Sequence, residues 1–299
     1  ALGKAIQAGS EGEGHVMRLM SFEIDGKTSF GAVEGDAVID LFPLLGQKYH
    51  SLREVLADDA LGKAIQAGSE GKPDHALKDV TFLPVIPDPR KIVCVGLNYE
   101  DHRIETGRDP TGYPVLFPRY ANCQVGHGQA MVKPRNSDQF DYEGELAVII
   151  GKAGRHIDRD DALKHIAGYA CYNDGSVRDW QAHTHQFMPG KNFTATGAFG
   201  PWMVTSDEIP DPSRLTLTTR LNGEVMQHAN TDQLIFNVPF LISYITSFME
   251  LEPGDVIVSG TPGGVGMKRT PPVFMKDGDT VEVEITNVGV LINPIENEG

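Results

Sequence analysis

Two glutamates stand at the start of an apolar run in residues 141–151, DYEGELAVIIG. Side chains of a β-strand alternate between its faces, so Glu143 and Glu145 share one face with Ala147 and Ile149. Two carboxylates this close repel each other and lose hydration in a half-buried strand, and a hard divalent cation is the simplest way to neutralise them. The stretch alone leaves a second interpretation open, a solvated strand end whose glutamates face water.

A third carboxylate follows a second apolar run. Residues 168–172, GYACY, are typical of a buried strand, which ends at Asn173 and Asp174. An aspartate at this exit is well placed to complete a carboxylate cluster. Three carboxylates without neighbouring Cys or paired His ligands favour Mg²⁺, Mn²⁺ or Ca²⁺ over Zn²⁺. On local grounds an N-cap role for Asp174 agrees equally well with the sequence.

A histidine and a glutamate lie three residues apart in residues 97–105, LNYEDHRIE. If Asn98 or Asp101 caps a short helix here, His102 and Glu105 fall on one face of it. A carboxylate that orients an imidazole and raises its basicity is the minimum equipment for activating a water molecule. The alternative is a salt link on an exposed helix, which is locally the more common case. The next segment, residues 106–118, is rich in Gly, Pro and charge, as mobile lids are.

Other motifs restrict the chemistry. Lys191, in the sequence PGKNF, is either an electrostatic clamp or an ordinary surface lysine, and local evidence favours the surface. Residues 260–266, GTPGGVG, lack the Lys-Ser/Thr ending and the following helix of a phosphate-binding loop, which excludes nucleotide binding. The chain has no GxSxG elbow and no cysteine in a catalytic setting, so we expect no covalent nucleophile.

The elements that must position these residues divide the chain in two. Its 299 residues allow one large domain, or a main domain with a smaller partner. Alternating runs at 18–24 and 29–33, joined by Asp-Gly-Lys, predict a hairpin. A further strand and a helical segment follow, so residues 17–85 are predicted to form a small N-terminal α/β domain, which the proline-rich stretch 84–89 closes. Residues 86–299 form the predicted main domain.

One repeat lies outside this scheme. Residues 1–12, ALGKAIQAGSEG, recur without change at residues 60–71, and nothing else in the chain is duplicated. The second copy continues a helical pattern, whereas the first runs into a segment where we expect a native start at Met17. We therefore interpret residues 1–16 as an artefact and leave them out of the fold prediction.

Composition excludes several classes of partner. A formal net charge of −15 argues against nucleic acids and anionic membranes, both of which require a basic surface. No apolar run reaches the length of a membrane span, and no signal-peptide core is visible. The three cysteines, Cys94, Cys123 and Cys171, show no CxxC spacing and are expected to be reduced, which favours a cytoplasmic protein.

Taken in order, the motifs of residues 91–295 resemble the fumarylacetoacetate hydrolase family, and within it the branch that hydrolyses acylpyruvates such as maleylpyruvate and fumarylpyruvate. The matching pieces are GLNY at 96–99 leading to His102-x-x-Glu105, Glu143-x-Glu145, Asp174 with Arg178 and Gln181, Lys191 in GKxF, and GTPxGVG at 260–266. No single piece is diagnostic, but their joint presence in the family's order is strongly specific. The resemblance implies an α+β fold, with a mixed β-roll catalytic domain, usually in a homodimer, and a small N-terminal domain in some members.

The resemblance also implies roles for the matching residues. Glu143, Glu145 and Asp174 match the ligands of Mg²⁺ or Mn²⁺, and His102 and Glu105 match a water-activating dyad carried on a lid. The substrate contacts correspond to Arg178, Gln181, Lys191 and Thr261. One position departs from the pattern, because related branches often carry a lysine where this chain has Arg119. A guanidinium can hold a second carboxylate bidentately, which would suit a dicarboxylic substrate.

The implied reaction is hydrolysis of the carbon–carbon bond between the two carbonyls of a 2,4-diketo acid, giving pyruvate and a carboxylic acid, as in aromatic catabolism. In it Lys191 is expected to steady the developing oxyanion. Other family branches suggest an alternative, in which the same metal site decarboxylates, isomerises or hydrates a 2-keto diacid of the oxaloacetate type. A third interpretation is a metal-stabilised binding protein without catalytic activity.

Overall fold

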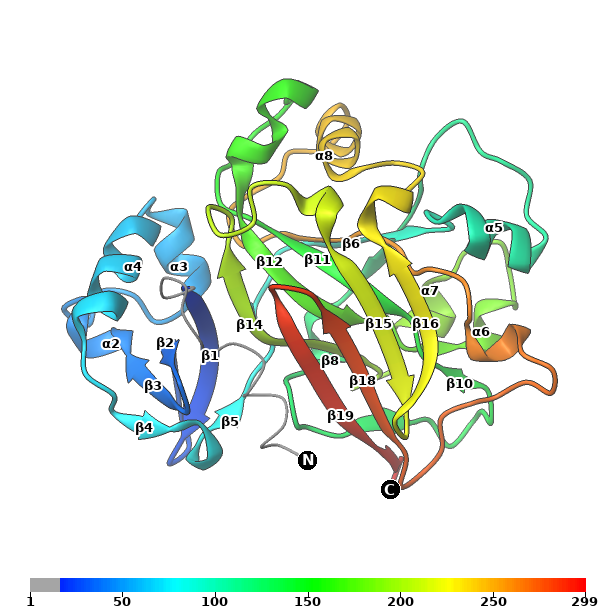
Figure 1. The fold of residues 1–299 in the computed structure, drawn as a ribbon, viewed down its shortest axis with the longest axis horizontal. Coiled ribbons are helices and arrows are strands. Elements are labelled where there is room, and N and C mark those ends of the chain that lie inside the picture. The colour runs from blue at the N-terminus through cyan, green and yellow to red at the C-terminus, as the bar shows by residue number, and fades with distance from the viewer. Residues whose placement is uncertain (1–16) are drawn as a thin grey trace.

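The computed structural model describes residues 17–299, so the predicted artefact at residues 1–16 lies outside the described residues. Within the described part the strands form sheets of 12, 5 and 2 strands. Figure 1 shows a small N-terminal region in blue beside a larger body in which two sheets pack face to face. This arrangement confirms the predicted α+β fold, a mixed β-roll with a small N-terminal α/β part.

The N-terminal region is a short antiparallel sheet with helices on one side. The predicted hairpin is present, because β1 and β2 pair from Leu19↔Ala32 to Ile24↔Lys27 around a turn at Asp25 and Gly26, both with positive φ. The elements of this region are β1 (Arg18–Ile24), β2 (Lys27–Glu34), β3 (Ala37–Asp40), α2 (Leu41–Leu44), α3 (Leu52–Ala57), α4 (Leu61–Glu70), β4 (His75–Ala76) and β5 (Thr81–Phe82).

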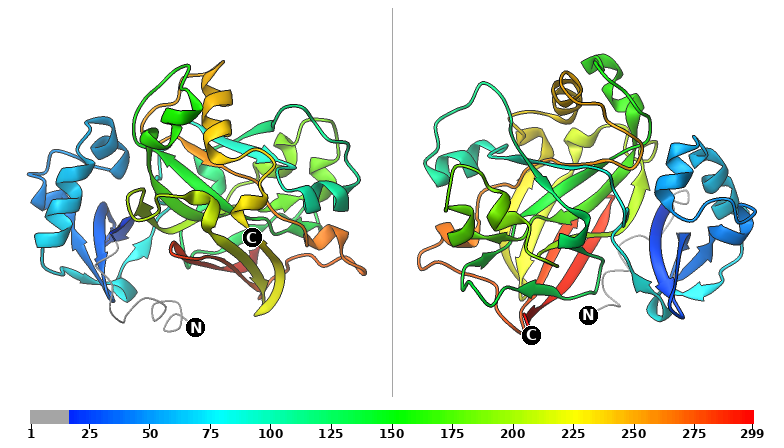
Figure 2. Two further views of the ribbon diagram at one scale, coloured as in Figure 1. Left: turned by 45° about the horizontal axis from the view of Figure 1, so that its top comes forward. Right: turned by 180° about the vertical axis from the view of Figure 1, so that it is seen from behind.

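The large sheet runs through both regions. Its order is β4-β3-β2-β1-β14-β12-β11-β17-β6-β7, and β1 joins the larger region by pairing with β14 at Arg18↔Val204. The views in Figure 2 agree that the N-terminal region continues the sheet at the side of the roll. The strands that the larger region contributes to this sheet are β6 (Ile92–Gly96), β7 (Val115–Arg119), β8 (Gln124–Val125), β11 (Gly144–Ile150), β12 (Ile166–Asn173), β14 (Gly197–Thr205) and β17 (Val256–Val258).

A five-stranded sheet, β16-β15-β18-β19-β9, covers one face of β11. Leu146, Val148 and Ile150 pack in one hydrophobic cluster with Leu217 and Val283 of this second sheet. Ala147 and Ile149 belong to a second cluster on the opposite face. The predicted alternation of β11 is therefore correct, but both faces are buried. The strands are β9 (Met131–Lys133), β15 (Thr216–Leu221), β16 (Glu224–Asn230), β18 (Thr280–Ile285) and β19 (Gly289–Asn297).

Short helices and a two-stranded ribbon complete the larger region. They are α5 (Glu100–Thr106), α6 (Arg178–Gln181), α7 (Met188–Lys191), α8 (Val238–Thr246), and the ribbon of β10 (Phe140–Asp141) and β13 (Ser176–Val177). A 3₁₀ helix, Arg159–His165, comes directly before β12, which begins at Ile166. Among the described residues no helix combines the length and apolarity that a membrane span requires.

Candidate active site

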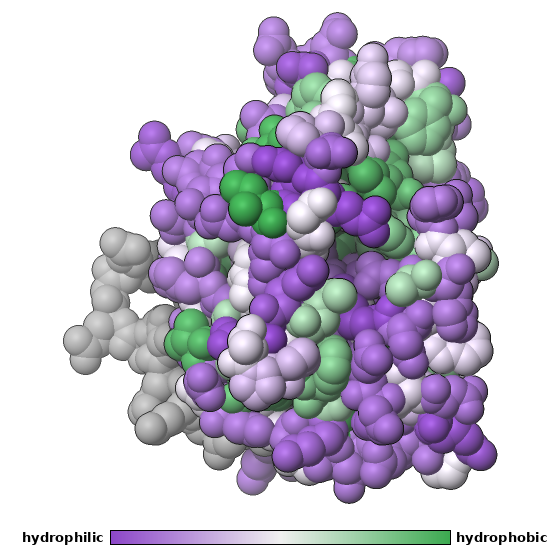
Figure 3. Space-filling view, turned by 90° about the vertical axis from the view of Figure 1, so that its right-hand side faces the viewer, coloured by the Kyte–Doolittle hydropathy of each residue, from purple (hydrophilic) through white to green (hydrophobic). Residues whose placement is uncertain are grey.

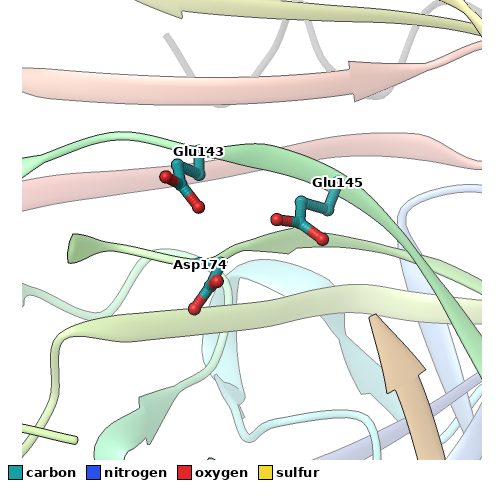
Figure 4. Close-up of side chains that lie close together, drawn as sticks. All are labelled: Glu143, Glu145 and Asp174. Atoms are coloured by element: carbon teal, nitrogen blue, oxygen red, sulfur yellow. The ribbon is translucent and has the colours of Figure 1, made fainter. Parts of the chain in front are cut away.

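Two adjacent strands bring the three carboxylates together. β11 and β12 pair antiparallel with Gly144 opposite Asn173, so Glu143 lies at the start of β11 and Asp174 just after the end of β12. Ligand oxygens of Glu143, Glu145 and Asp174 lie within 4.8 Å of one another. Figure 4 shows both glutamates on the same side of β11, with Asp174 facing them. All three are at least 95% buried, so the solvated strand end is excluded.

Buried cations neutralise two of the three carboxylates. Lys191 Nζ lies 2.7 Å from Glu143 Oε2 and 2.6 Å from Asp174 Oδ2, and Arg178 Nη1 lies 2.6 Å from Glu143 Oε1. Lys191 is 1% exposed, which excludes an ordinary surface lysine. Burial opposes ionisation of Glu143, yet Lys191 and Arg178 hold its pKa below the usual value. These contacts keep the local charge close to balance.

Glu145 differs, because within residues 17–299 no cation forms an ion pair with it. Its one hydrogen bond comes from the Gly260 amide, 2.5 Å from Oε2. Burial, together with the charges of Asp174 and Glu143, raises the pKa of Glu145 well above its ordinary value. A group in this setting is ionised only if further positive charge is supplied.

The donor set fits a hard dication. The buried network contains four carboxylates (Asp141, Glu143, Glu145, Asp174) and three cations (Arg119, Arg178, Lys191), so when fully ionised it carries one excess negative charge. All the candidate ligand atoms are carboxylate oxygens, the ligand type that Mg²⁺ and Mn²⁺ prefer. Each carboxylate has several lone pairs, so an oxygen that accepts from Lys191 can still face an ion.

Glycines let the backbone approach at two points of the cluster. A Cβ on Gly144 would lie 2.0 Å from Thr219 Oγ1, because β15 packs directly on the middle of the Glu143-x-Glu145 motif. Gly260 has φ +110°, and its Cβ would lie 2.7 Å from the Cβ of Asn98. Any side chain at Gly260 would disturb the amide that binds Glu145.

The dyad lies on α5, at the wall of the site. His102 and Glu105 are separated by 3.5 Å between Nδ1 and Oε2, a distance long for a hydrogen bond but typical of catalytic pairs before substrate binds. His102 is 5% exposed, so the surface salt link is excluded. Glu105 Oε2 also accepts a hydrogen bond from the Gly264 amide at 3.0 Å, which holds α5 against the glycine-rich loop.

The predicted cap of this helix is wrong. The N-cap of α5 is Tyr99, without a side-chain cap, and neither Asn98 nor Asp101 takes that place. Asn98 is instead fully buried and donates from Nδ2 to the carbonyls of Ser259 and Phe236. It ties the start of α5 to two segments more than a hundred residues away, a contact that local patterns do not reveal.

A cavity of about 520 Å³ opens onto the cluster. Seven of the ten predicted site residues line it: His102, Glu143, Glu145, Arg178, Gln181, Lys191 and Thr261. Asp174 is not part of the lining and lies against Lys191. A second cavity of about 560 Å³ lies on the other side of α5 and is lined by Glu105, so the dyad separates the two spaces.

Two polar residues missed at the sequence level support the site. Asp141 accepts from Arg178 Nε at 2.8 Å and from the amides of Gly266 and Met267 at 2.8 and 2.9 Å, which fixes Arg178 beneath the cavity. Gln227 donates to Thr261 Oγ1 at 2.8 Å and accepts from the Gly144 amide. The position of Asp141, two residues before Glu143 in the same motif, could have indicated its role from the sequence. The sequence around Gln227 contains no feature that indicates a role in the site.

Arg119 does not lie where the sequence prediction requires. It is absent from the lining of the cavity and 2% exposed. Its Nη1 donates to Asp174 Oδ1 at 2.5 Å and to the Gly175 carbonyl, and its Nη2 donates to Thr196 Oγ1 at 3.0 Å. The guanidinium already donates to these groups and lies on the far side of Asp174 from the cavity, so it cannot bind a second substrate carboxylate. The prediction that Arg119 contacts the substrate is therefore corrected: Arg119 holds Asp174 in place.

Comparison with known proteins decides the family. Residues 91–296 match the family model described as fumarylacetoacetate (FAA) hydrolase C-terminal. The chain belongs to the fumarylacetoacetate hydrolase family. Among its relatives, the mitochondrial oxaloacetate tautomerase FAHD2A of Homo sapiens is 44% identical over 219 residues, which cover 73% of this chain and 70% of the relative. The corresponding protein of Xenopus laevis is 37% identical over 287 residues, covering 93% and 90%.

Solved structures of the family extend the likeness to the whole fold. A maleylpyruvate hydrolase from Sphingobium sp. SYK-6, in complex with manganese(II) and pyruvate, has a TM-score of 0.78 at 30% identity and covers 95% of this chain and 100% of its own. A 5-carboxymethyl-2-hydroxymuconate delta-isomerase from Mycobacterium smegmatis has a TM-score of 0.75 at 30% identity, with coverages of 95% and 100%. The protein is thus an enzyme of this family, and tautomerases, hydrolases and isomerases all occur among its relatives.

Three predictions remain untested within the family assignment. The homodimer stays a prediction, and so does the cytoplasmic location, since the tautomerase relatives carry the word mitochondrial in their names. The predicted division into residues 17–85 and 86–299 likewise stays a prediction, although the family model begins at residue 91.

Proposed function

We propose that this enzyme catalyses the divalent-metal-dependent enolisation of a 2-keto dicarboxylic acid, interconverting the keto and enol forms of oxaloacetate or a close analogue. The observation that carries the proposal is the buried carboxylate cluster, which faces one cavity together with Lys191, Arg178 and His102. The 44% identity to an oxaloacetate tautomerase supports this reaction over the others of the family.

In this proposal Glu143, Glu145 and Asp174 hold Mg²⁺ or Mn²⁺. The ion supplies Lewis acidity toward the 1-carboxylate and 2-keto oxygens of the substrate when bound. The binding of an anion also requires cations of the chain, and Arg178 and Lys191 are the buried ones in the lining. Their position supports a role in orienting the keto acid within the cavity.

Enolisation moves one proton and one electron pair. The C3–H bond breaks, its electrons form the C2=C3 bond, and the C2 oxygen gains negative charge and then a proton. His102, with Glu105 behind it, is the candidate base at C3, since among the described residues it is the imidazole of the lining that is buried beside the carboxylates, whereas His183 and His185 are exposed. Lys191 Nζ is the candidate donor toward the C2 oxygen.

A second candidate is hydrolysis of an acylpyruvate, and the size of the cavity favours it. The space of about 520 Å³ continues past the carboxylates to a mouth lined by His183 and His185, which leaves room for more than a four-carbon acid. Here His102 and Glu105 would activate water for attack on the C4 carbonyl. The C3–C4 bond then breaks, C3 takes up a proton, and pyruvate and a carboxylic acid are released.

The two candidates are separated by substrate. Purified enzyme with saturating Mg²⁺ is mixed with oxaloacetate, and the approach to keto–enol equilibrium is followed through the enol absorbance. Maleylpyruvate and fumarylpyruvate are tested by loss of their enol absorbance. Faster equilibration of oxaloacetate, abolished by EDTA and by Glu145→Gln, supports the tautomerase. Turnover of the acylpyruvates alone supports the hydrolase, and no reaction with any of the three overturns the proposal.

A further inference from the structure

We propose that Arg108 and Lys268 form a second anion-binding subsite at the mouth of the cavity, where they hold the terminal carboxylate of an extended 2-keto diacid. The inference deepens the proposed function and rests on it, because it presumes that the 2-keto acid end of the substrate lies at the carboxylate cluster. Arg108 and Lys268 thus take the place of Arg119, which was predicted from the sequence to bind the second carboxylate of the substrate.

The lining of the cavity changes from nearly balanced charges at its inner end, where Arg178 and Lys191 face the carboxylates, to cations without carboxylates at its mouth. Its acidic residues are Glu143 and Glu145, both at the buried end. The exposed end is lined by two cations, Arg108 and Lys268, with two histidines beside them. In a chain with a net charge of −15, a mouth lined by cations is a local reversal of the field that favours entry of an anion.

Both cations have their charged groups available. Within residues 17–299 the structure records no ion pair or side-chain hydrogen bond for Arg108 or Lys268. Arg103, five residues before Arg108, is by contrast paired with Glu100 at 2.5 Å. An exposed cation without a carboxylate partner retains its full capacity for a charged ligand, and a guanidinium can bind a carboxylate through two parallel hydrogen bonds.

The buried cations cannot serve this second carboxylate. Arg119 is used behind Asp174, as described above. Arg178 donates to Asp141 and Gln181 and pairs with Glu143, so its one unpartnered nitrogen, Nη2, lies at the inner end beside the carboxylates. Lys191 is held between two carboxylates at the same end. A diacid with its keto end at the cluster therefore finds its second partner at the mouth.

Arg108 also connects the subsite to the dyad. Helix α5 ends at Thr106, and the φ of 69° at its C-cap, Gly107, turns the chain. Arg103 Nη1 donates to the Arg108 carbonyl at 2.6 Å. The backbone of Arg108 is thus tied to the helix that carries His102. An anion bound by Arg108 stabilises α5 over the inner carboxylates, so the subsite affects kcat as well as KM.

The second cation comes from another part of the chain. Lys268 ends the 3₁₀ turn Gly266–Lys268, whose first two amides are held by Asp141. Figure 3 shows the face of the molecule that is on the right in Figure 1, where α5 and α6 lie; it is mainly hydrophilic. Two segments that are far apart in the sequence therefore bring one positive charge each to the same opening.

The experiment compares acids of equal length that differ in their last group. Exchange of the C3 protons for deuterium is followed by NMR in D₂O with Mg²⁺-loaded enzyme, using 2-oxoadipate and 2-oxohexanoate. We expect the wild type to prefer the diacid by about tenfold in kcat/KM, a value typical of one charge-assisted contact. Arg108→Gln and Lys268→Gln should each reduce this preference, and the double variant should abolish it. Lys276→Gln, which removes an exposed cation outside the lining, should leave it unchanged.

A binding measurement separates this inference from the proposed function. Calorimetric titration of the same acids into Mg²⁺-loaded enzyme reports the preference without turnover. If neither acid exchanges but the diacid still binds more tightly, and only in proteins that retain Arg108 and Lys268, the subsite stands and the proposed enolisation fails. If both acids exchange or bind equally well in the wild type, or if the double variant keeps the preference, the subsite is overturned.

Discussion

Lys191 Nζ lies 2.6 Å from Asp174 Oδ2, so an ammonium group occupies one edge of the carboxylate cluster. The same nitrogen lies 2.7 Å from Glu143 Oε2, whereas Glu145 has only a backbone amide for a partner. The three carboxylates are therefore not equivalent. Two of them are balanced by the chain itself, and the third is the one whose charge an added dication would balance.

Replacing Glu145 by Gln should remove the stabilisation by metal without destabilising the metal-free protein. Without metal, the raised pKa of Glu145 means that the wild type must take up a proton at this residue when it folds, a cost that Gln does not have. In EDTA the free energy of unfolding of the variant should therefore equal or exceed that of the wild type. Saturating Mg²⁺ or Mn²⁺ should stabilise the wild type by about 3 kcal/mol when the metal concentration is about a hundred times Kd, and this gain should be lost in the variant. Urea denaturation with and without metal measures both quantities.

Glu143→Gln provides the matched comparison. It leaves Lys191 and Arg178 facing one carboxylate fewer, and removal of one partner from a buried ion pair costs about 3 to 5 kcal/mol. We expect this variant to be destabilised in EDTA, unlike Glu145→Gln. Equal destabilisation of the two variants in EDTA would contradict the assignment of Glu145 as the uncompensated ligand.

Replacing His102 or Glu105 by Gln should remove activity and leave the metal site intact. Loss of a general base typically reduces the rate by about 10² to 10⁴-fold, and both residues are outside the carboxylate cluster. The rise in Tm on addition of Mn²⁺ should match that of the wild type. Glu100→Gln on the same helix is the control and should keep its activity. A Glu105 variant with wild-type kcat would exclude the dyad.

The sequence predicted those parts of the site that depend on local spacing. The shared face of Glu143 and Glu145 follows from strand alternation, and the pairing of His102 with Glu105 follows from helical spacing. It could not show that β11 is buried on both faces, because that requires the five-stranded sheet, which comes from residues 131–133 and 216–297. Arg119 was misassigned for a related reason: its partner, Asp174, is 55 residues away and its side chain lies behind the cluster.

Replacing Arg119 by Gln should affect stability and metal affinity but not the choice of substrate. The variant leaves Asp174 Oδ1 without its charged partner in a fully buried site, which costs about 3 to 5 kcal/mol. Because Arg119 orients Asp174, the affinity for Mn²⁺ should fall, while the preference for diacids over monoacids should stay at the wild-type value. Calorimetric titrations of Mn²⁺ and of both acids test this. A selective loss of diacid binding would restore the original assignment of Arg119 as a substrate contact.

His127 should make folding less favourable as the solution becomes acidic. Burial against the edge of the Phe82 ring, 4.9 Å between centroids, lowers the pKa of His127 to about 4, below its ordinary value of about 6.5. Since the folded state disfavours the charged ring, the full stability is present above about pH 6.5 and is lost as the pH falls toward 4, by about 3 kcal/mol in total.

His127 Nδ1 accepts from the Ile292 amide at 3.1 Å, and the side-chain oxygen of Asn can take that bond. In His127→Asn, urea denaturation between pH 7 and 4 should therefore show a shallower loss of stability than in the wild type, whereas His50→Asn, at an exposed histidine, should follow the wild type. Parallel pH dependence in all three proteins would mean that His127 does not titrate in this range.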